Sequence, residues 1–294
     1  MKHYFRIIKT LISLLFISGC TPELGARTTE PVSVIWYDDY FTIEYIDSET
    51  IAIGEPRYHQ QNYSYLIIGD SRAVLFDSGS GVRNIKPVVE SLTKLPVTVS
   101  QSHLHYDHIG NHKEFGGAAL PDLSYLRNRA ESGKLPINLK EYLGFVENIK
   151  TSSLEASEWW SRNSNIDLGG RILTVIFTPG HTKDSMMLYD QDRKLLFTGD
   201  FIYPGQLFAM LPGSSLQDYL ASTRYLLGVA PSETKLLTAH RDQSSVKFGA
   251  PVLSHADLID LQKSLERIIN KKAKGEGFYI KTYRINDRIE LMTD

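Results

Sequence analysis

The stretch that most constrains this chain lies at residues 102–111, which read S-H-L-H-Y-D-H-I-G-N. Four potential metal ligands fall within six residues there: His103, His105, Asp107 and His108. In an extended segment alternate side chains point to the same side, so the first two imidazoles can face one cation. A turn at Asp107 and His108 then directs a carboxylate and a third imidazole toward a second cation. Imidazole and carboxylate are ligands for zinc, and for iron or manganese in sites richer in oxygen. The stretch therefore predicts a metal site.

Composition limits the classes of protein to consider. The chain has 294 residues, of which 42% are hydrophobic and 22% are charged, so it is long and apolar enough to bury a large core. Its formal net charge is -2, and its Lys and Arg residues form no long block. A nucleic-acid partner therefore has no electrostatic support, and we expect a small-molecule substrate and no protein partner.

The N-terminus has the pattern of an export signal. A basic start precedes a short apolar run, and small residues follow: Lys2, Arg6, Lys9, residues 11–17 and Ile17-Ser18-Gly19-Cys20. This order is typical of a secretory signal, and the run is too short to span a bilayer. The Ile-Ser-Gly-Cys ending resembles a bacterial lipobox, in which the cysteine is lipid-modified after cleavage. The alternative is an ordinary signal or N-terminal anchor with an incidental cysteine.

These features predict a signal peptide at residues 1–19 and a membrane anchor through lipidated Cys20. The protein would then be exported to the bacterial cell envelope, on the periplasmic side of the outer membrane in a Gram-negative cell. Cys20 is the only cysteine, so the folded part has neither a disulfide nor a thiolate ligand. Residues 20–31 contain Pro22, Gly25 and Pro31 and are predicted to form a tether to a folded domain at residues 32–294.

The folded part has two sets of strand patterns, each with helical patterns nearby. The strands are predicted at residues 32–36, 41–46, 51–54, 62–68, 73–76, 95–99, 172–178, 185–189, 194–198, 235–237, 278–283 and 288–292. Amphipathic helices are predicted at residues 85–95, 215–227 and 254–269, the last with capping-box spacing between Ser254 and Asp257. Residues 66–77 and 187–198 share one sequence pattern: a strand, a turn, a basic residue and a second strand. We therefore expect two packed sheets with helices outside.

The segment at residues 113–167 differs in character. We expect short helices there at residues 125–126, 139–149 and 154–160, separated by Gly, Pro and Ser-Asn stretches. Because it is short, we interpret it as a helical insertion near the site and not as a separate domain.

Three further potential ligands each follow an apolar strand: His181, Asp200 and His240. One such residue at a strand end is usually an ordinary polar loop residue. Three in succession, downstream of H-x-H-x-D-H, predict that all of them join the same metal site.

With these residues in order, the chain resembles the metallo-β-lactamase-fold hydrolase superfamily across nearly all of residues 32–294. The resemblance implies a four-layer αββα sandwich (an α/β fold) with two divalent metal ions at one edge of the sheets, most commonly Zn²⁺, with Fe or Mn as options. It implies that His103, His105 and His181 hold the first metal, that Asp107, His108 and His240 hold the second, and that Asp200 bridges the two. It also implies that Asp77 supports the histidine loop and binds no metal.

The implied activity is hydrolysis by a water shared between two cations, which would give hydroxide near neutral pH. By analogy, Asp107 would orient this hydroxide or pass a proton to the leaving group. Tyr203 lies three residues after Asp200, where one lactonase group has a tyrosine that polarises the substrate; packing is the other interpretation. His112 is expected near the site but not as a ligand, and Gly110 and Gly180 are expected to allow close backbone approach.

The fold alone does not choose a substrate. Lactamase subclasses with a cysteine ligand do not fit this chain, and Asp200 disfavours β-lactams as the main substrate. Asp200 resembles the bridging ligand of glyoxalase II-like thioesterases and of acyl-homoserine-lactone lactonases, although export disfavours a glutathione thioester. We therefore predict an ester, lactone or thioester hydrolase. The alternatives are a β-lactam hydrolase and a non-catalytic metal-binding lipoprotein; the complete ligand set favours an enzyme.

Overall fold

The computed structural model describes residues 34–150, 153–242 and 248–294. The predicted signal peptide, Cys20 and the tether lie outside these residues. None of the described helices is long and apolar enough to cross a membrane.

The first sheet has nine strands in the order β1-β2-β3-β4-β5-β6-β7-β9-β8. Their bounds are β1 (Ile35–Trp36), β2 (Thr42–Asp47), β3 (Thr50–Gly54), β4 (Tyr63–Ile68), β5 (Ala73–Phe76), β6 (Val97–Ser100), β7 (Ala118–Pro121), β8 (Lys134–Pro136) and β9 (Ser153–Trp160). Strands β1 to β5 form an antiparallel meander. The pairs β5–β6, β6–β7 and β7–β9 are parallel, so these strands end at the same edge of the sheet.

The second sheet has six strands in the order β10-β11-β12-β13-β15-β16. Their bounds are β10 (Asn165–Asp167), β11 (Ile172–Phe177), β12 (Met186–Asp190), β13 (Leu195–Gly199), β15 (Lys235–Thr238) and β16 (Val252–Ser254). A third, three-stranded sheet has the order β14-β18-β17, formed by β14 (Gly205–Phe208), β17 (Lys281–Arg284) and β18 (Ile289–Thr293). The antiparallel pairs β4–β5 and β12–β13 confirm the strand–turn–strand pattern predicted for both halves of the chain.

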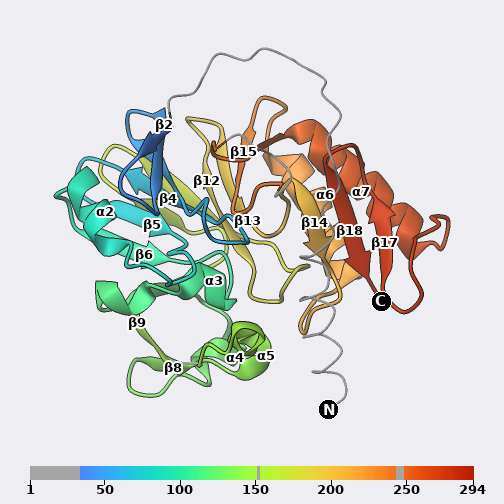
Figure 1. Cartoon of the computed structure of the whole chain (residues 1–294), viewed down its shortest axis with the longest axis horizontal. Coiled ribbons are helices and arrows are strands. Elements are labelled where there is room, and N and C mark those ends of the chain that lie inside the picture. Colours follow the sequence, from blue (N-terminus) through green and yellow to red (C-terminus); the bar gives the residue numbers. More distant parts are fainter. Residues whose placement is uncertain (1–33, 151–152, 243–247) are drawn as a thin grey trace.

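Helices cover the outer faces of both large sheets, as Figure 1 shows. Helix α2 (Lys86–Leu92) packs on the first sheet, and helices α6 (Leu216–Val229) and α7 (His255–Ile269) pack on the second. The remaining helices among the described residues are short: α3 (Tyr106–Ile109), η1 (His112–Phe115), α4 (Ser124–Arg127), α5 (Leu139–Tyr142) and η2 (Gly144–Glu147). The order helix, sheet, sheet, helix confirms the predicted αββα sandwich.

Alternation along the central strands explains why the two sheets pack together. In β5, Leu75 faces the core under α2, whereas Phe76 faces the core between the sheets. In β13, Leu196 faces the core under α6 and α7, whereas Phe197 faces the core between the sheets. Each strand therefore buries both faces, because successive side chains of a strand point to opposite sides.

The predicted capping box of the last long helix is present. The Ser254 side chain and the Asp257 carboxylate cap the first turn of α7, and the buried face carries Leu258, Leu261 and Leu265. This arrangement satisfies backbone N–H groups that have no partner within the helix.

The helical interpretation of residues 154–160 is wrong, because this stretch forms strand β9. Its side chains alternate in burial, with Leu154 and Trp160 buried and Glu155 exposed. Parallel pairing with β7 and antiparallel pairing with β8 satisfy its backbone. Tertiary pairing therefore overrides the apparent helical spacing. The short helices α4, α5 and η2 do occur in the segment, but β7 and β9 also extend the first sheet.

Candidate metal centre

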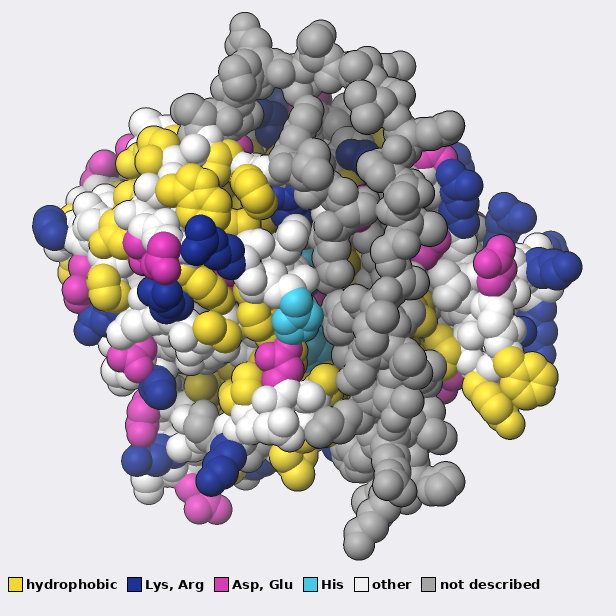
Figure 2. Space-filling model, in the orientation of Figure 1, with side chains coloured by type: hydrophobic (Ala, Val, Ile, Leu, Met, Phe, Trp, Pro, Cys, Tyr) yellow, Lys and Arg dark blue, Asp and Glu magenta, His cyan; other side chains and the backbone are white. Residues whose placement is uncertain are grey.

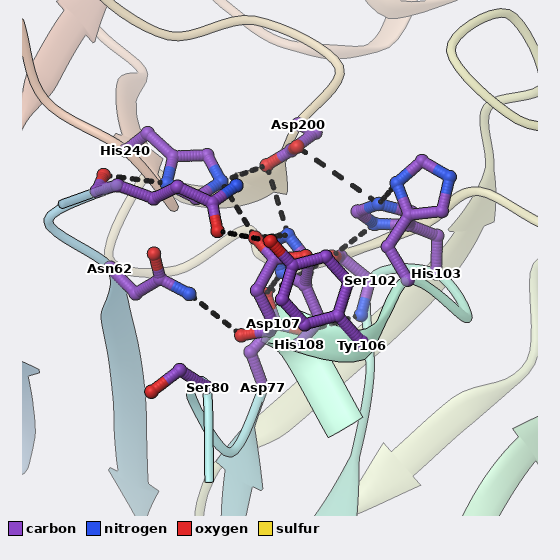
Figure 3. Close-up of polar contacts among 12 residues, drawn as sticks. Asn62, Asp77, Ser80, Ser102, His103, Tyr106, Asp107, His108, Asp200 and His240 are labelled. Atoms are coloured by element: carbon purple, nitrogen blue, oxygen red, sulfur yellow. Dashed lines mark hydrogen bonds and ion pairs between the residues drawn. The ribbon is translucent and has the colours of Figure 1, made fainter. Parts of the chain in front are cut away.

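The predicted histidine stretch lies where β6 ends and a short helix begins. His105 has extended backbone dihedrals as the N-cap of α3, so Asp107 and His108 lie on the first turn of that helix. The expected turn at these two residues is thus helical. His103, His105, Asp107 and His108 are at most 5% exposed. Ligands from an extended loop and from a helix therefore meet in one buried place (Figure 3).

The first group of potential ligands joins the loop to the second sheet. His103 Nε2 lies 2.7 Å from His105 Nδ1, and His181 Nε2 lies 3.3 Å from the same Nδ1 atom. His181 lies on the loop between β11 and β12. With Asp200, these residues form a buried set whose ligand atoms all lie within 4.8 Å of one another.

The second group is built from α3 and the loop after β15. Asp107 Oδ2 lies 3.3 Å from His108 Nε2 and 3.4 Å from His240 Nε2. These three residues form a second buried set of ligand atoms within 4.8 Å of one another.

Asp200 lies between the two groups. Its Oδ2 atom is 4.0 Å from His103 Nε2 and 3.7 Å from His181 Nε2. Its Oδ1 atom is 3.3 Å from His108 Nε2 and 3.0 Å from His240 Nε2. One carboxylate oxygen thus faces each group, which is the arrangement a bridging ligand needs.

Four of the imidazoles are oriented by oxygen atoms at their second ring nitrogen. The Nδ1 contacts are His103 with Ser102 Oγ at 3.0 Å, His108 with Asp77 Oδ2 at 2.9 Å, His181 with the carbonyl of Phe208 at 2.8 Å, and His240 with the carbonyl of Gln60 at 3.0 Å. A carbonyl or carboxylate at Nδ1 accepts a hydrogen bond and fixes the proton on that nitrogen. Nε2 is then left to bind a cation.

The electrostatics of the two groups differ. Burial lowers the pKa of His105 to about 3, and the adjacent His181 imidazole acts in the same direction. Burial also opposes the charged form of His240, but the carboxylates of Asp200 and Asp107 outweigh it and raise the pKa of His240 to about 10. Burial opposes ionisation of Asp200 as well, yet His240 and His108 hold its pKa well below the usual range. The first group thus offers neutral imidazoles, whereas in the second group a cation would displace the proton that the carboxylates favour on His240.

The donor set fits two divalent cations. Three side-chain atoms facing the second group are buried and form no hydrogen bond of good geometry, although their nearest polar neighbours lie 3.0 to 3.4 Å away: Asp107 Oδ2, His108 Nε2 and Asp200 Oδ1. Unpaired buried polar atoms are costly, and cations would satisfy them. Three imidazoles with a shared carboxylate, beside two imidazoles with two carboxylates, match the ligand types that Zn²⁺ accepts.

Comparison with known families agrees with this geometry. The family model described as Metallo-beta-lactamase superfamily matches residues 57–274, which is well over half of the chain. The chain belongs to the metallo-beta-lactamase superfamily. Its seven potential ligands all lie within the matched range.

Several named proteins are similar to this chain. The chain is 28% identical over 194 residues to a human protein named acyl-coenzyme A thioesterase MBLAC2, covering 55% of this chain and 66% of that protein, which is just under two thirds of it. It is 25% identical over 198 residues to a hydroxyacylglutathione hydrolase of Thermosynechococcus vestitus, covering 65% of this chain and 69% of that protein. The solved structure of a metallo-beta-lactamase from Pontibacter korlensis has a TM-score of 0.55 at 18% identity, covering 77% of this chain and 99% of that one. This structural similarity shows that the two proteins share a fold.

Asp77 supports the histidine loop of this superfamily member, as expected. Its Oδ1 accepts the backbone N–H of Ser102 at 2.6 Å, and its Oδ2 contacts Ser102 Oγ at 3.0 Å and His108 Nδ1 at 2.9 Å. Asp77 has a φ of 62°, in the left-handed region that aspartate tolerates better than most residues. The chain thus turns sharply after β5 to aim this carboxylate at the loop.

Replacing Asp77 with alanine should weaken metal binding without removing a ligand. We expect about a 10–100-fold loss of affinity for the second cation, because His108 would lose the acceptor that fixes its orientation. Competition with a fluorescent zinc chelator measures this change. Asp70→Ala, in the turn before β5, is the control and should bind metal as the wild type does. Equal affinity of Asp77→Ala and wild type would contradict the supporting role.

Other residues that sequence reasoning placed near the site support it. His112 is buried between Ser78 Oγ at 2.7 Å and Gln101 Oε1 at 3.0 Å, so it lies behind the ligands and is not one of them. A Cβ atom at Gly110 would lie 2.3 Å from the carbonyl carbon of Ser80, and one at Gly180 would lie 2.7 Å from the Cα of Tyr219. Both glycines therefore allow the close backbone approach that was expected.

Three contributors were not expected from the sequence. Asn62 Nδ2 donates to the carbonyl of Asp107 at 2.7 Å, and the Asp184 carboxylate accepts the backbone N–H of Leu104 at 2.9 Å. Ser102 links Asp77 to two of the imidazoles. Only Ser102 carried a signal in the sequence, because it directly precedes the first histidine.

Asp184 should make stability depend on pH. Burial, with a smaller effect of Glu141, raises the pKa of this carboxyl to about 6. The folded chain therefore binds the proton more tightly than the unfolded chain, and stability falls as pH rises from about 4 to about 6. In metal-free protein, Asp184→Asn should raise the free energy of unfolding by up to about 3 kcal/mol at pH 7.5 and change it little at pH 4. Guanidinium unfolding at both pH values checks this, and an equal gain at both would contradict it.

Tyr203 lies beside the second group of ligands. Its ring centroid is 5.2 Å from that of His240, and it is 6% exposed. Its hydroxyl donates a hydrogen bond to the backbone carbonyl of Gln206. The structure thus places the ring at the site and directs the hydroxyl to the backbone. The catalytic role of Tyr203 stays a prediction.

Proposed function

We propose that this protein is a hydrolase that uses two divalent cations, held by the seven buried ligands, to cleave an acyl ester or thioester. The position of Asp200 carries the proposal, because its two oxygens face the two groups of imidazoles separately. The bound cations would supply a hydroxide near neutral pH and polarise the substrate carbonyl. The relatives named thioesterase and hydrolase support the reaction class.

The chain's own residues would position the reactants. Asp107 is buried, and its backbone carbonyl is held by the amide of Asn62. Its carboxylate would orient the attacking water and carry a proton to the leaving group. His108 and His240, each fixed through Nδ1, would bind the second cation beside this carboxylate.

An open hollow in the segment between β8 and β9 supports an acyl substrate. It is lined by Leu139, Phe145, Asn148, Ile149 and Lys150, so it combines apolar side chains with one cation. Asn148 follows Glu147, whose Oε1 accepts a hydrogen bond of 2.8 Å from Tyr106, the residue between His105 and Asp107. The segment that lines the hollow is thus hydrogen-bonded, through Glu147, to the residue between two of the ligands. Apolar walls with few polar groups are typical of small-molecule sites.

Metal content and turnover test the proposal together. Purified protein is assayed for bound metal and for hydrolysis of a lactone, a thioester, a phosphodiester and a cephalosporin, before and after chelation. We expect about two metal ions per chain, and chelator-sensitive turnover of the thioester or lactone. Turnover of the cephalosporin alone would favour a β-lactam hydrolase. About two metals per chain with no turnover of any substrate would favour a non-catalytic metal-binding lipoprotein. Less than one metal per chain after zinc loading, with no turnover, would overturn the proposed enzyme.

The variant Tyr203→Phe, assayed with the substrate that the panel identifies, tests whether the Tyr203 hydroxyl takes part in catalysis. A hydroxyl that polarises the substrate predicts that kcat falls at least tenfold, with stability nearly unchanged. A hydroxyl confined to the Gln206 carbonyl predicts the opposite: kcat within about threefold and a loss of about 1 kcal/mol in stability. We expect the second result from the hydrogen bond that the hydroxyl makes.

We also propose that the protein acts in the cell envelope, with residues 1–19 removed and Cys20 lipidated. The lipobox-like ending of the N-terminal segment supports this location. Metabolic labelling with a fatty acid should mark the wild type and leave Cys20→Ser unlabelled. Labelling of neither protein would contradict the lipid anchor and leave the hydrolase proposal intact.

A further inference from the structure

A closed loop projects from the edge of the small third sheet, next to β17. The backbone of Glu276 and Thr282 exchanges two hydrogen bonds, of 2.9 and 2.8 Å, which close the loop at its base. Gly277 has a φ of 103°, a conformation that residues with a Cβ rarely adopt. The tip, residues 277–280, reads Gly-Phe-Tyr-Ile. The loop therefore has a defined hairpin conformation.

The tip exposes two aromatic side chains. Phe278 is 82% exposed and Tyr279 is 84% exposed, whereas the next most exposed large hydrophobic residue of the described chain, Val82, is 58% exposed. The two rings contact each other edge to face, with centroids 4.9 Å apart. Figure 2 shows hydrophobic side chains projecting at the right edge of the molecule, beside a group of Lys and Arg side chains. Paired aromatic rings in water are unusual, and such exposure marks an interaction site.

The surroundings of the tip are strongly basic. Residues 271–284 contain five Lys and Arg residues and one acidic residue, although the whole chain has a formal net charge of -2. Lys271, Lys272 and Lys274 are exposed, and no carboxylate of the described residues lies within 4.0 Å of their amino groups. Arg284 differs, because it pairs with Asp287 at 2.6 Å. The three lysines thus present uncompensated charge next to the aromatic pair.

We propose that this tip, together with the lysines on either side of it within residues 271–281, docks on the surface of an anionic phospholipid bilayer. Aromatic side chains with an apolar body prefer the level of the headgroups, and lysines are attracted to anionic lipids. A second copy of the chain is disfavoured as the occupant, because it would bring two sets of lysines together. The contact is separate from the predicted lipid on Cys20 and from the metal centre, and it would hold the domain in a fixed orientation on the membrane.

Vesicle binding tests the proposal in the full chain carrying Cys20→Ser, so that no protein is lipidated and all share one N-terminus. Vesicles of phosphatidylcholine alone are compared with vesicles containing phosphatidylglycerol. The aromatic variant is Phe278→Ser with Tyr279→Ser, matched by Tyr45→Ser, an aromatic side chain that is 52% exposed on the first sheet. The charge variant replaces Lys271, Lys272 and Lys274 with Gln, and its control replaces the exposed Lys113, Lys140 and Lys235 in the same way.

We expect binding only to the anionic vesicles, and weaker binding as salt is raised. The charge variant should bind about 100-fold more weakly, because each lysine near an anionic surface is worth about fivefold in affinity. The affinity of the aromatic variant should be lower by at least about tenfold. Both controls should bind as the parent does. In a Phe278→Trp variant, brominated lipids should quench the fluorescence of the added tryptophan. This quenching should exceed that of the parent, which has only the three native tryptophans.

Three results would overturn the proposal. If the parent, the aromatic variant and the charge variant bound vesicles equally, the N-terminus that they share would account for the binding. An unquenched tryptophan at position 278 would place the tip away from the lipid. A concentration-dependent dimer that the aromatic variant abolishes would make a second copy the occupant.

Discussion

Replacing Asp200 with alanine is expected to lower kcat/KM by about 10³-fold or more and the metal content from about two ions per chain to about one. The carboxylate lies 3.0 Å from His240 Nε2 through one oxygen and 3.7 Å from His181 Nε2 through the other. Its removal takes an anionic ligand from both groups at once. A metal ion contributes several kcal/mol to a transition state that develops negative charge, so loss of one ion accounts for this factor.

The measurements are metal analysis after gel filtration and steady-state kinetics on the substrate that the wild type hydrolyses. Asp192→Ala is the matched control, because Asp192 is an exposed aspartate in the turn between β12 and β13. It should keep both metal content and activity. Asp200→Asn adds a second comparison, because it keeps the shape of the side chain and removes its charge. If Asp200→Ala retained two ions and full activity, Asp200 would not be a bridging ligand.

Replacing Phe197 with alanine is expected to cost about 3–5 kcal/mol in the free energy of unfolding. Phe197 is fully buried in the core between the two large sheets. Its ring centroid lies 5.3 Å from that of Tyr65 and 6.4 Å from that of Phe76, both in the opposite sheet. The truncation would leave a cavity that rigid strands on both sides cannot fill.

Guanidinium unfolding with zinc held constant measures this loss as a lower midpoint at an unchanged slope. Phe278→Ala is the control, because Phe278 is 82% exposed and should change the stability by less than about 0.5 kcal/mol. A similarly small loss for Phe197→Ala would mean that the two sheets do not depend on a shared core.

Much of the fold could be predicted from local sequence because local patterns and tertiary packing agree. The capping box at Ser254 and Asp257 and the stripe of leucines define α7 in both the sequence and the structure. Residues 154–160 show where this agreement ends. The pattern from Leu154 to Trp160 is compatible with one face of a helix or of a strand, and only its pairing with β7 and β8 decides.

The types of ligand could be predicted from the sequence, but their orientation could not. Four potential ligands within six residues mark the site whatever the tertiary structure. The atoms that hold the ligands come from distant parts of the chain, as with the carbonyls of Gln60 and Phe208. A backbone carbonyl has no signature in a sequence, because every residue carries one. For the same reason Asn62 was missed, since an asparagine near a strand start is usually a turn residue.

The ligands are divided between the two large sheets. His103, His105, Asp107 and His108 follow β6 of the first sheet, whereas His181, Asp200 and His240 follow strands of the second. Bound cations would therefore act as crosslinks across the sandwich, joining segments that are far apart along the chain. Metal binding is then coupled to the cooperativity of folding. The loaded protein should therefore melt at a higher temperature than the metal-free protein, with a difference that grows with the concentration of free metal.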